Sequence, residues 1–196
     1  SERHTRLLGI ATLTEEDTMN RKTIRRSAAA LALGLVASTA PAAVGASSAS
    51  AAPYCGIYWG SLGKSSTTMK ATTLTGVRAG RHTCFDRLVI DHKGAATGYD
   101  VRYVSQVTQD GSGFPVPVAG GARLQIIDRA ARWTAGPAMP NVTGFTTFRD
   151  VKWAGSFEGQ STVGLGVRAR LPFRVFTLND TATGTSRLVI DVAHYW

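Results

Sequence analysis

The sequence predicts an all-β protein, a single β-sandwich domain of about eight short strands preceded by a cleavable signal helix. After residue 51, short stretches of alternating apolar and polar residues are separated by turns that contain Gly and Pro. No helical pattern of ten residues occurs in that part of the chain. The sequence Arg-Leu-Val-Ile-Asp occurs twice, at 87–91 and at 187–191. Both copies alternate at period two, so we interpret them as strands with related structural roles.

The N-terminal region has the three parts of a secretory signal peptide in the expected order. Residues 20–26 are basic, 28–44 are apolar, and 49–51 form a small-x-small cleavage site. We therefore assign 19–51 to a signal peptide that starts at Met19, and 1–18 to an extra segment upstream of the true start. The apolar run is shorter than the roughly 20 residues of a membrane-spanning helix. We expect no transmembrane segment in the mature chain.

Cleavage after Ala51 leaves 145 residues, a length that suits one domain with a real core. This mature part has 16 basic and nine acidic side chains, a net charge of +7. Such a surface attracts polyanions outside the cell. No block of five like charges occurs, so a specific nucleic-acid partner is not indicated. We expect a secreted, extracellular protein, with the cell wall as a candidate place of association.

The mature part contains two cysteines, Cys55 and Cys84. In an exported chain a disulfide between them is the expected state, and a catalytic cysteine is the alternative. The bridge would close a loop of about 30 residues and stabilise the fold by roughly 3 kcal/mol. On this basis 52–73 is a disulfide-pinned arm and loop, and 74–196 is the β-sandwich domain.

Further alternating stretches follow the first copy of the repeated sequence. In the stretch 99–107 we expect one face to carry Tyr99, Val101, Tyr103 and Val107. Residues 110–113 predict a turn, and Pro115 and Pro117 keep the next run at an edge or in a loop. The other predicted strands lie at 122–128, 144–153, 163–170 and 173–178.

Several motifs together resemble the AMIN-like domain of secreted actinobacterial proteins. The residues that carry this resemblance are Gly80-Arg81-His82, 85–91, Gly98-Tyr99, 101–104, Gly120, Ala122, Leu124, Phe157-Glu158-Gly159, Gly166, 172–175 and 187–191. The resemblance implies kinship with the AMIN domain of cell-wall amidases and secretin components. That domain is a non-catalytic sandwich of two similar sheets that targets its host to peptidoglycan.

Motifs of known enzyme classes are missing from the sequence. Neither His-Glu-x-x-His nor Gly-x-Ser-x-Gly occurs, and the histidines of the mature part lie outside metal-type spacing. We expect His82 and His92 to cap strand ends at the surface. Asp86 and Glu158 can be assigned to glycosidase chemistry only by guesswork. We therefore predict no enzyme activity, no catalytic residue, no metal site and no cofactor.

The candidate binding site is a polar groove for a wall glycan or its peptide stem, with Arg side chains for carboxylates. The candidate ligand-binding residues are Arg81, His82, Asp86, Arg87, Glu158, Arg187 and Asp191. Alternatively, four of them pair across neighbouring strands and only define the register, namely Asp86, Arg87, Arg187 and Asp191. The expected partner is peptidoglycan or another anionic wall polymer. A secreted protein partner, bound through the basic segment 78–82 by an interaction or inhibitor module, is the alternative.

Overall fold

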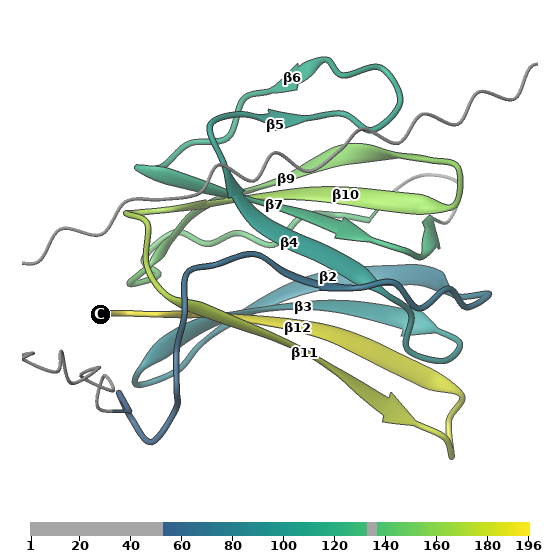
Figure 1. Ribbon diagram of the computed structural model, residues 1–196, viewed down its shortest axis with the longest axis horizontal. Helices are drawn as coiled ribbons and strands as arrows, with labels where there is room; N and C mark the ends of the chain where they lie inside the picture. Colours follow the sequence, from purple (N-terminus) through teal and green to yellow (C-terminus); the bar gives the residue numbers. More distant parts are fainter. Residues whose placement is uncertain (1–52, 133–136) are drawn as a thin grey trace, which may run out of the picture. The chain divides into compact units, whose positions relative to one another are not determined.

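The computed structural model describes residues 53–132 and 137–196, whose regular secondary structure consists of β-strands (Figure 1). Two five-stranded sheets lie face to face, and a two-stranded ribbon lies beside one of them. This confirms the predicted all-β sandwich. The extra segment 1–18 and the signal peptide assigned to 19–51 lie outside the described residues. Within these two described ranges, no helix is long and apolar enough to cross a membrane.

The first sheet, called the β3–β12 sheet, has the strand order β11-β12-β3-β2-β8. Its strands are β2 (Thr73–Arg81), β3 (Phe85–Lys93), β8 (Ala131–Arg132), β11 (Phe173–Asp180) and β12 (Thr185–Ala193). The second, called the β7–β10 sheet, has the order β1-β4-β7-β10-β9. Its strands are β1 (Lys64–Ser66), β4 (Tyr99–Val104), β7 (Ala122–Asp128), β9 (Phe148–Phe157) and β10 (Gln160–Val167). The ribbon consists of β5 (Val107–Thr108) and β6 (Pro115–Val116).

Eight of these strands have six or more residues, and the other four have two or three. The predicted number of about eight strands therefore agrees with the number of long strands and leaves out the short ones. Strands of two or three residues are too short to produce an alternating pattern, so a sequence pattern does not detect them.

The two copies of the repeated sequence lie in neighbouring antiparallel strands, β3 and β12. Their register aligns Val89 with Val189, Arg87 with Asp191, and Asp91 with Arg187. Antiparallel pairing reverses one copy against the other, so the Arg of each copy lies opposite the Asp of its counterpart. The copies therefore form the paired centre of one sheet.

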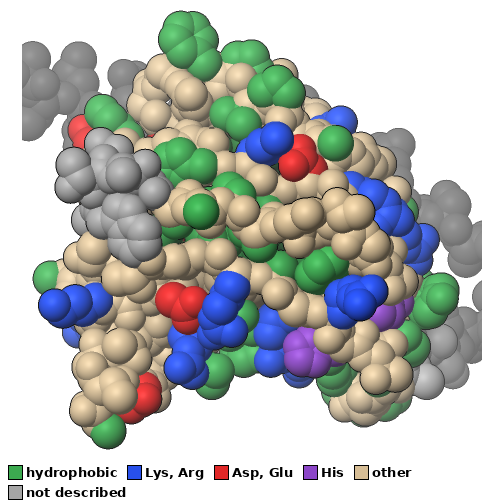
Figure 2. Space-filling model, turned by 180° about the vertical axis from the view of Figure 1, so that it is seen from behind, with side chains coloured by type: hydrophobic (Ala, Val, Ile, Leu, Met, Phe, Trp, Pro, Cys, Tyr) green, Lys and Arg blue, Asp and Glu red, His purple; other side chains and the backbone are tan. Residues whose placement is uncertain are grey.

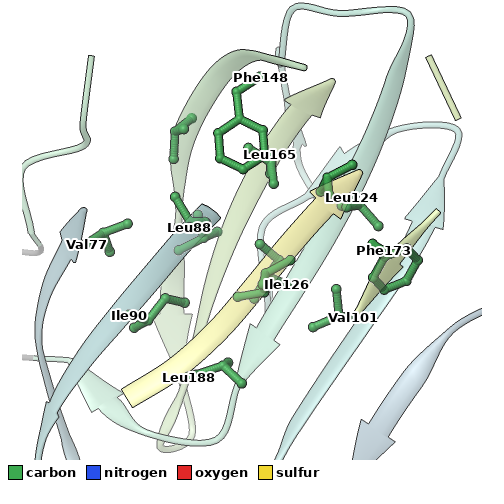
Figure 3. Packing of buried hydrophobic residues seen from close by; sticks show 14 of the residues in the cluster. Val77, Leu88, Ile90, Val101, Leu124, Ile126, Phe148, Leu165, Phe173 and Leu188 are labelled. Atoms are coloured by element: carbon green, nitrogen blue, oxygen red, sulfur yellow. The ribbon is translucent and has the colours of Figure 1, made fainter. Parts of the chain in front are cut away.

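The core lies between the two sheets (Figure 3). Every second residue of β3 and β12 points into it, including Leu88, Ile90 and Leu188, and each of these is at most 1% exposed. Side chains of the facing sheet complete the cluster, among them Val101, Leu124, Ile126, Phe148 and Leu165. Each buried Leu or Ile contributes roughly 1.5–3 kcal/mol, so these alternating positions hold the two layers together.

The outer face of the β7–β10 sheet is covered by the ribbon and the segment after it. A side chain at Gly166 would place its Cβ 1.8 Å from the carbonyl oxygen of Ala119, and one at Gly164 would lie 2.8 Å from Val118. Val107 packs in a small cluster on this outer face. The prediction that it shares a strand face with Tyr99 is therefore wrong, because β4 ends at Val104.

The predicted disulfide joins Cys55 to Cys84 in the structure. It links the arm to the residue that precedes β3. Further along, the Phe173 N–H donates a hydrogen bond of 2.9 Å to the Gly60 carbonyl, so the arm crosses the start of β11. The arm then enters the β7–β10 sheet as β1, which pairs with β4.

Candidate binding surface

The outer face of the β3–β12 sheet carries the polar residues of both repeated copies. Because side chains alternate along a strand, the Arg, the Val and the Asp of each copy point away from the core. Neighbouring strands add one arginine each. We call the resulting group the arginine face: Arg78, Arg87, Arg174, Arg187, Asp91 and Asp191. In the lower half of Figure 2, Lys and Arg side chains gather beside acidic and histidine side chains.

Asp191 is held by two arginines and is 0% exposed. Arg87 binds it with two hydrogen bonds, Nε to Oδ1 at 2.6 Å and Nη2 to Oδ2 at 2.9 Å. Arg174 donates to Oδ2 at 2.8 Å. The hydrogen bonds to Asp191 raise the pKa of Arg87 above its ordinary value. One carboxylate thus fixes two charged guanidinium groups.

Asp91 has the corresponding position in the first copy but is less enclosed, with its side chain 30% exposed. Arg78 donates to both of its oxygens, at 2.7 and 3.1 Å. Arg187 lies 3.6 Å from Oδ1 and is 43% exposed. The arginine face therefore has four guanidinium groups and two carboxylates, an excess of two positive charges.

A pocket of about 270 Å³ opens on this face. Val89 and Val189 belong to its lining, and they are only 4% and 1% exposed although they point away from the core. The other lining residues are Arg78, Ala79, Gly80, His82, Arg87, Leu178 and Arg187. Three arginines thus surround an apolar base, an arrangement that suits an anionic group attached to an apolar body.

Aromatic rings border this pocket toward β11. The Arg174 guanidinium lies 5.6, 5.4 and 5.2 Å from the ring centroids of Trp59, Phe85 and Phe176. The His82 ring stacks on Phe85 with centroids 4.6 Å apart. Cation–π contacts of this kind keep an arginine at a ring surface. The border therefore offers flat apolar faces next to positive charge.

Three of the seven predicted ligand-binding residues belong to the arginine face: Arg87, Arg187 and Asp191. His82 lies beside them in the pocket lining. Arg81, at the end of β2, instead donates to the Gly144 carbonyl at 3.2 Å.

Asp86 and Glu158 lie elsewhere. Asp86 is 0% exposed on the inward side of β3, where it accepts hydrogen bonds from the backbone N–H groups of Thr147 and Phe148 and contacts His194 at 3.2 Å. Glu158 is in the turn between β9 and β10 with φ of 46°. The structure thus separates these two carboxylates from the arginine face.

His92 is buried, so its predicted position at the surface is wrong. It is 2% exposed, and its Nε2 lies 2.6 Å from Asp128 Oδ2 on the facing sheet. The reason is alternation: Asp91 points outward, so the next residue of β3 points inward. Burial raises the pKa of Asp128 above its ordinary value of 3.8, and the hydrogen bond from His92 opposes this rise.

Three members of the arginine face were not among the predicted site residues: Arg78, Asp91 and Arg174. The signal for Asp91 is present in the sequence, because antiparallel pairing of the two copies places it opposite Arg187. The signal for Arg78 and Arg174 depends on which strands flank β3 and β12. That order is not encoded in a local pattern.

A larger hollow of about 760 Å³ lies on the other sheet, beside the segment 116–119. Its charged groups already have partners within the protein. Asp150 accepts a hydrogen bond from the Ala119 N–H at 3.0 Å, and Arg123 Nε donates to the Val118 carbonyl at 2.9 Å. These groups hold the covering segment on the sheet, so we place the candidate site on the arginine face.

Among the residues that the structure describes, no group of three or more His, Cys, Asp or Glu side chains could hold a metal ion. A model of the AMIN-like domain family matches residues 72–194. The match covers β2 to β12 and therefore includes all residues of the arginine face. No curated protein matches the chain.

Proposed function

Because the chain belongs to the AMIN-like domain family, we propose that it is an exported, non-catalytic binding module for the cell envelope. Domains of this family are in general cell-wall-related binding modules. The Cys55–Cys84 disulfide supports an extracellular or cell-wall location, since such bonds persist in oxidising compartments. The ligand we propose is peptidoglycan or another anionic wall polymer.

The observation that carries this proposal is the excess positive charge of the arginine face around an apolar pocket. Guanidinium groups bind carboxylate and phosphate through paired hydrogen bonds. Arg187 is the best placed for a ligand, because it is 43% exposed and its nearest carboxylate oxygen is 3.6 Å away. Arg78 is also exposed, at 57%.

Arg87 and Arg174 have a different role in this proposal. Both are committed to the fully buried Asp191 and cover it, with side chains 26% and 33% exposed. Their charge contributes to the positive electrostatic potential of the pocket. Their hydrogen bonds to Asp191 hold the neighbouring strands together. The ligand-binding and register-defining interpretations of these residues therefore apply to different arginines.

The position of the carboxylates supports binding without catalysis. Hydrolysis of a glycan needs two carboxyl groups on either side of one glycosidic bond. Asp86 is fully buried between the sheets, and Glu158 is in the turn between two strands of the other sheet. Neither points into the pocket of the arginine face.

The test is co-sedimentation with purified peptidoglycan. We expect Arg187→Ala to weaken binding about tenfold, the effect of losing a charge-assisted hydrogen bond of about 1.4 kcal/mol. The matched control is Arg102→Ala, an arginine 61% exposed on β4 of the other sheet. Equal binding by the wild type and both variants would contradict the proposed site.

A secreted protein partner is the alternative ligand. The basic segment 78–82 contributes Arg78 and His82 to the same pocket, so such a partner would compete for the same surface. Capture from culture supernatant distinguishes the two. A protein that binds the wild type but not the Arg187→Ala variant, with no binding to peptidoglycan, would favour the alternative.

A further inference from the structure

Strand β11 forms one edge of the β3–β12 sheet. The backbone groups of its residues alternate in direction. Phe173 donates outward to the arm, while Pro172 accepts from Ala193 on β12. By the same alternation, the N–H and C=O groups of Val175, Thr177 and Asn179 point away from β12. Within the described part of the chain, these groups have no hydrogen-bond partner.

The arm covers β11 only at Phe173, and the remainder of this edge lacks the protection that the other edges of the two sheets have in the described residues. β1 has only three residues, and the pairing of β9 is interrupted by two register shifts. On the other side of the β3–β12 sheet, β8 covers β2 only at Thr73 and Leu74, and the pairing of β2 is interrupted by a register shift. β11 pairs with β12 over eight residues without a shift, and it contains neither Pro nor Lys. Short length, bulges, Pro and Lys are the usual means of preventing edge-to-edge pairing. An edge that lacks all of them is able to receive another strand.

The sequence of β11 is complementary to itself when it is reversed about Thr177. Antiparallel pairing of two copies in this register places Arg174 opposite Asp180 and Phe176 opposite Leu178. Val175 then faces Asn179 and Thr177 faces Thr177, so all outward backbone groups meet as hydrogen-bonded pairs. We propose that two copies of this chain associate through β11 in this register and form a continuous ten-stranded sheet.

The exposure and charge of the side chains agree with this pairing. Leu178 is 45% exposed, and in the proposed pairing it is covered by contact with Phe176 of a second copy. Asp180 uses Oδ1 to accept from the N–H groups of Ala182 and Thr183. In the proposed pairing this carboxylate faces the Arg174 guanidinium of the second copy, so the two opposite charges lie close together.

The association has a consequence for binding. A twofold axis between antiparallel edge strands runs perpendicular to the sheet, so both arginine faces point in the same direction. A repetitive polymer would then be bound at two sites, and the second binding event would occur at a high effective concentration. The proposal itself does not depend on the ligand, because it rests on the edge alone.

The test is sedimentation equilibrium of the purified exported protein from on the order of 1 μM to 1 mM, a range suited to a small interface. We expect a reversible dimer. Leu178→Lys should raise its dissociation constant at least tenfold, because two buried ammonium groups would face the partner. Met69→Lys is the matched control, since Met69 is 59% exposed and lies outside β11. It should leave the dimer unchanged.

A second measurement tests the register. In the proposed pairing Thr177→Cys places two thiols at directly opposite positions, whereas Asn179→Cys places them about 14 Å apart along the strands. Oxidation should cross-link only the first variant. A chain that stays monomeric at 1 mM would overturn the proposal. So would a dimer equally stable in the two Lys variants, or cross-linking through position 179 but not 177.

Discussion

Asp191 and Asp86 are both fully buried, yet for different reasons. Asp86 points into the sandwich, where it accepts hydrogen bonds from two backbone N–H groups and contacts His194. Asp191 points away from the core and is buried because Arg87 and Arg174 cover it. Removing one charge from such a cluster leaves buried partner groups without their counter-charge. The resulting loss in the free energy of unfolding is larger than the contribution of an ion pair exposed to water.

We predict that Asp191→Asn lowers the free energy of unfolding by about 3 kcal/mol, because two guanidinium groups lose their carboxylate. Urea denaturation of both proteins measures the difference. Asp100→Asn is the control: its pair with Arg102 is at the surface, where solvent screens the two charges, so we expect little change in the free energy of unfolding. Similar losses in both variants would show that burial of Asp191 has no special importance.

The pair of His92 and Asp128 predicts a pH dependence of stability. Burial raises the pKa of Asp128 in the folded state, so the folded protein holds this proton more tightly than the unfolded chain does. The stabilisation that comes from this tighter proton binding is complete below pH 3.8. It declines as the pH rises through the pKa of Asp128 in the folded state. Asp128→Asn imitates the protonated form and lacks this decline.

We therefore expect the free energy of unfolding of Asp128→Asn, relative to the wild type, to increase between pH 4 and pH 7. Denaturation at several pH values provides the measurement. Parallel pH profiles for Asp128→Asn and the wild type would contradict the assignment.

At the scale of elements, β10 packs against other parts of the protein on both of its sides. Its inward residues, such as Val163 and Leu165, fill the core, while Gly164 and Gly166 on the other side admit the segment 118–119. A side chain at either glycine would collide with that segment. The alternating glycines are therefore required by close packing on the outer face of the sheet.

We predict that Gly166→Ala lowers the free energy of unfolding by about 1–3 kcal/mol, since its Cβ would lie 1.8 Å from the Ala119 carbonyl oxygen. Gly76→Ala on β2 is the matched control. The nearest atom to its added Cβ is Asp91 Oδ2, 3.9 Å away, so that site has room. Thermal denaturation of both variants tests the difference, and equal melting temperatures would refute it.

At the scale of the whole molecule, positive charge attracts the proposed anionic ligand before any direct contact forms. Residues 52–196 have a net charge of +7, and the arginine face has a local excess of positive charge. Attraction between exposed charges is screened over about 8 Å at physiological salt, whereas paired hydrogen bonds in a pocket are less affected. Salt dependence therefore separates general polyanion attraction from binding in the pocket.

We expect peptidoglycan binding to weaken on raising NaCl from 50 to 300 mM but to remain measurable, because the pocket contributes contacts that salt does not remove. Arg187→Ala should bind only at the low salt concentration. Co-sedimentation across this range measures both effects. Complete loss of wild-type binding at 150 mM would identify a general polyanion binder instead of a specific site.

The sequence by itself determined the fold class, the disulfide, the β7 strand at its observed bounds and the turn at 110–113, all confirmed by the structure. These features are local, or they follow from a small set of cysteines, so a pattern along the chain contains them. Alternation also assigned Leu88 and Ile90 to one side and Arg87 and Asp91 to the other.

Only the tertiary structure decided which strands are neighbours and which outer face is covered. The ribbon buries Val107 on the outside of one sheet, while β2 and β11 bring Arg78 and Arg174 to the outside of the other. His92 and Asp86 became buried because the inward side of β3 meets a second layer. Period-two alternation defines two sides of a strand, but long-range pairing decides what each side meets.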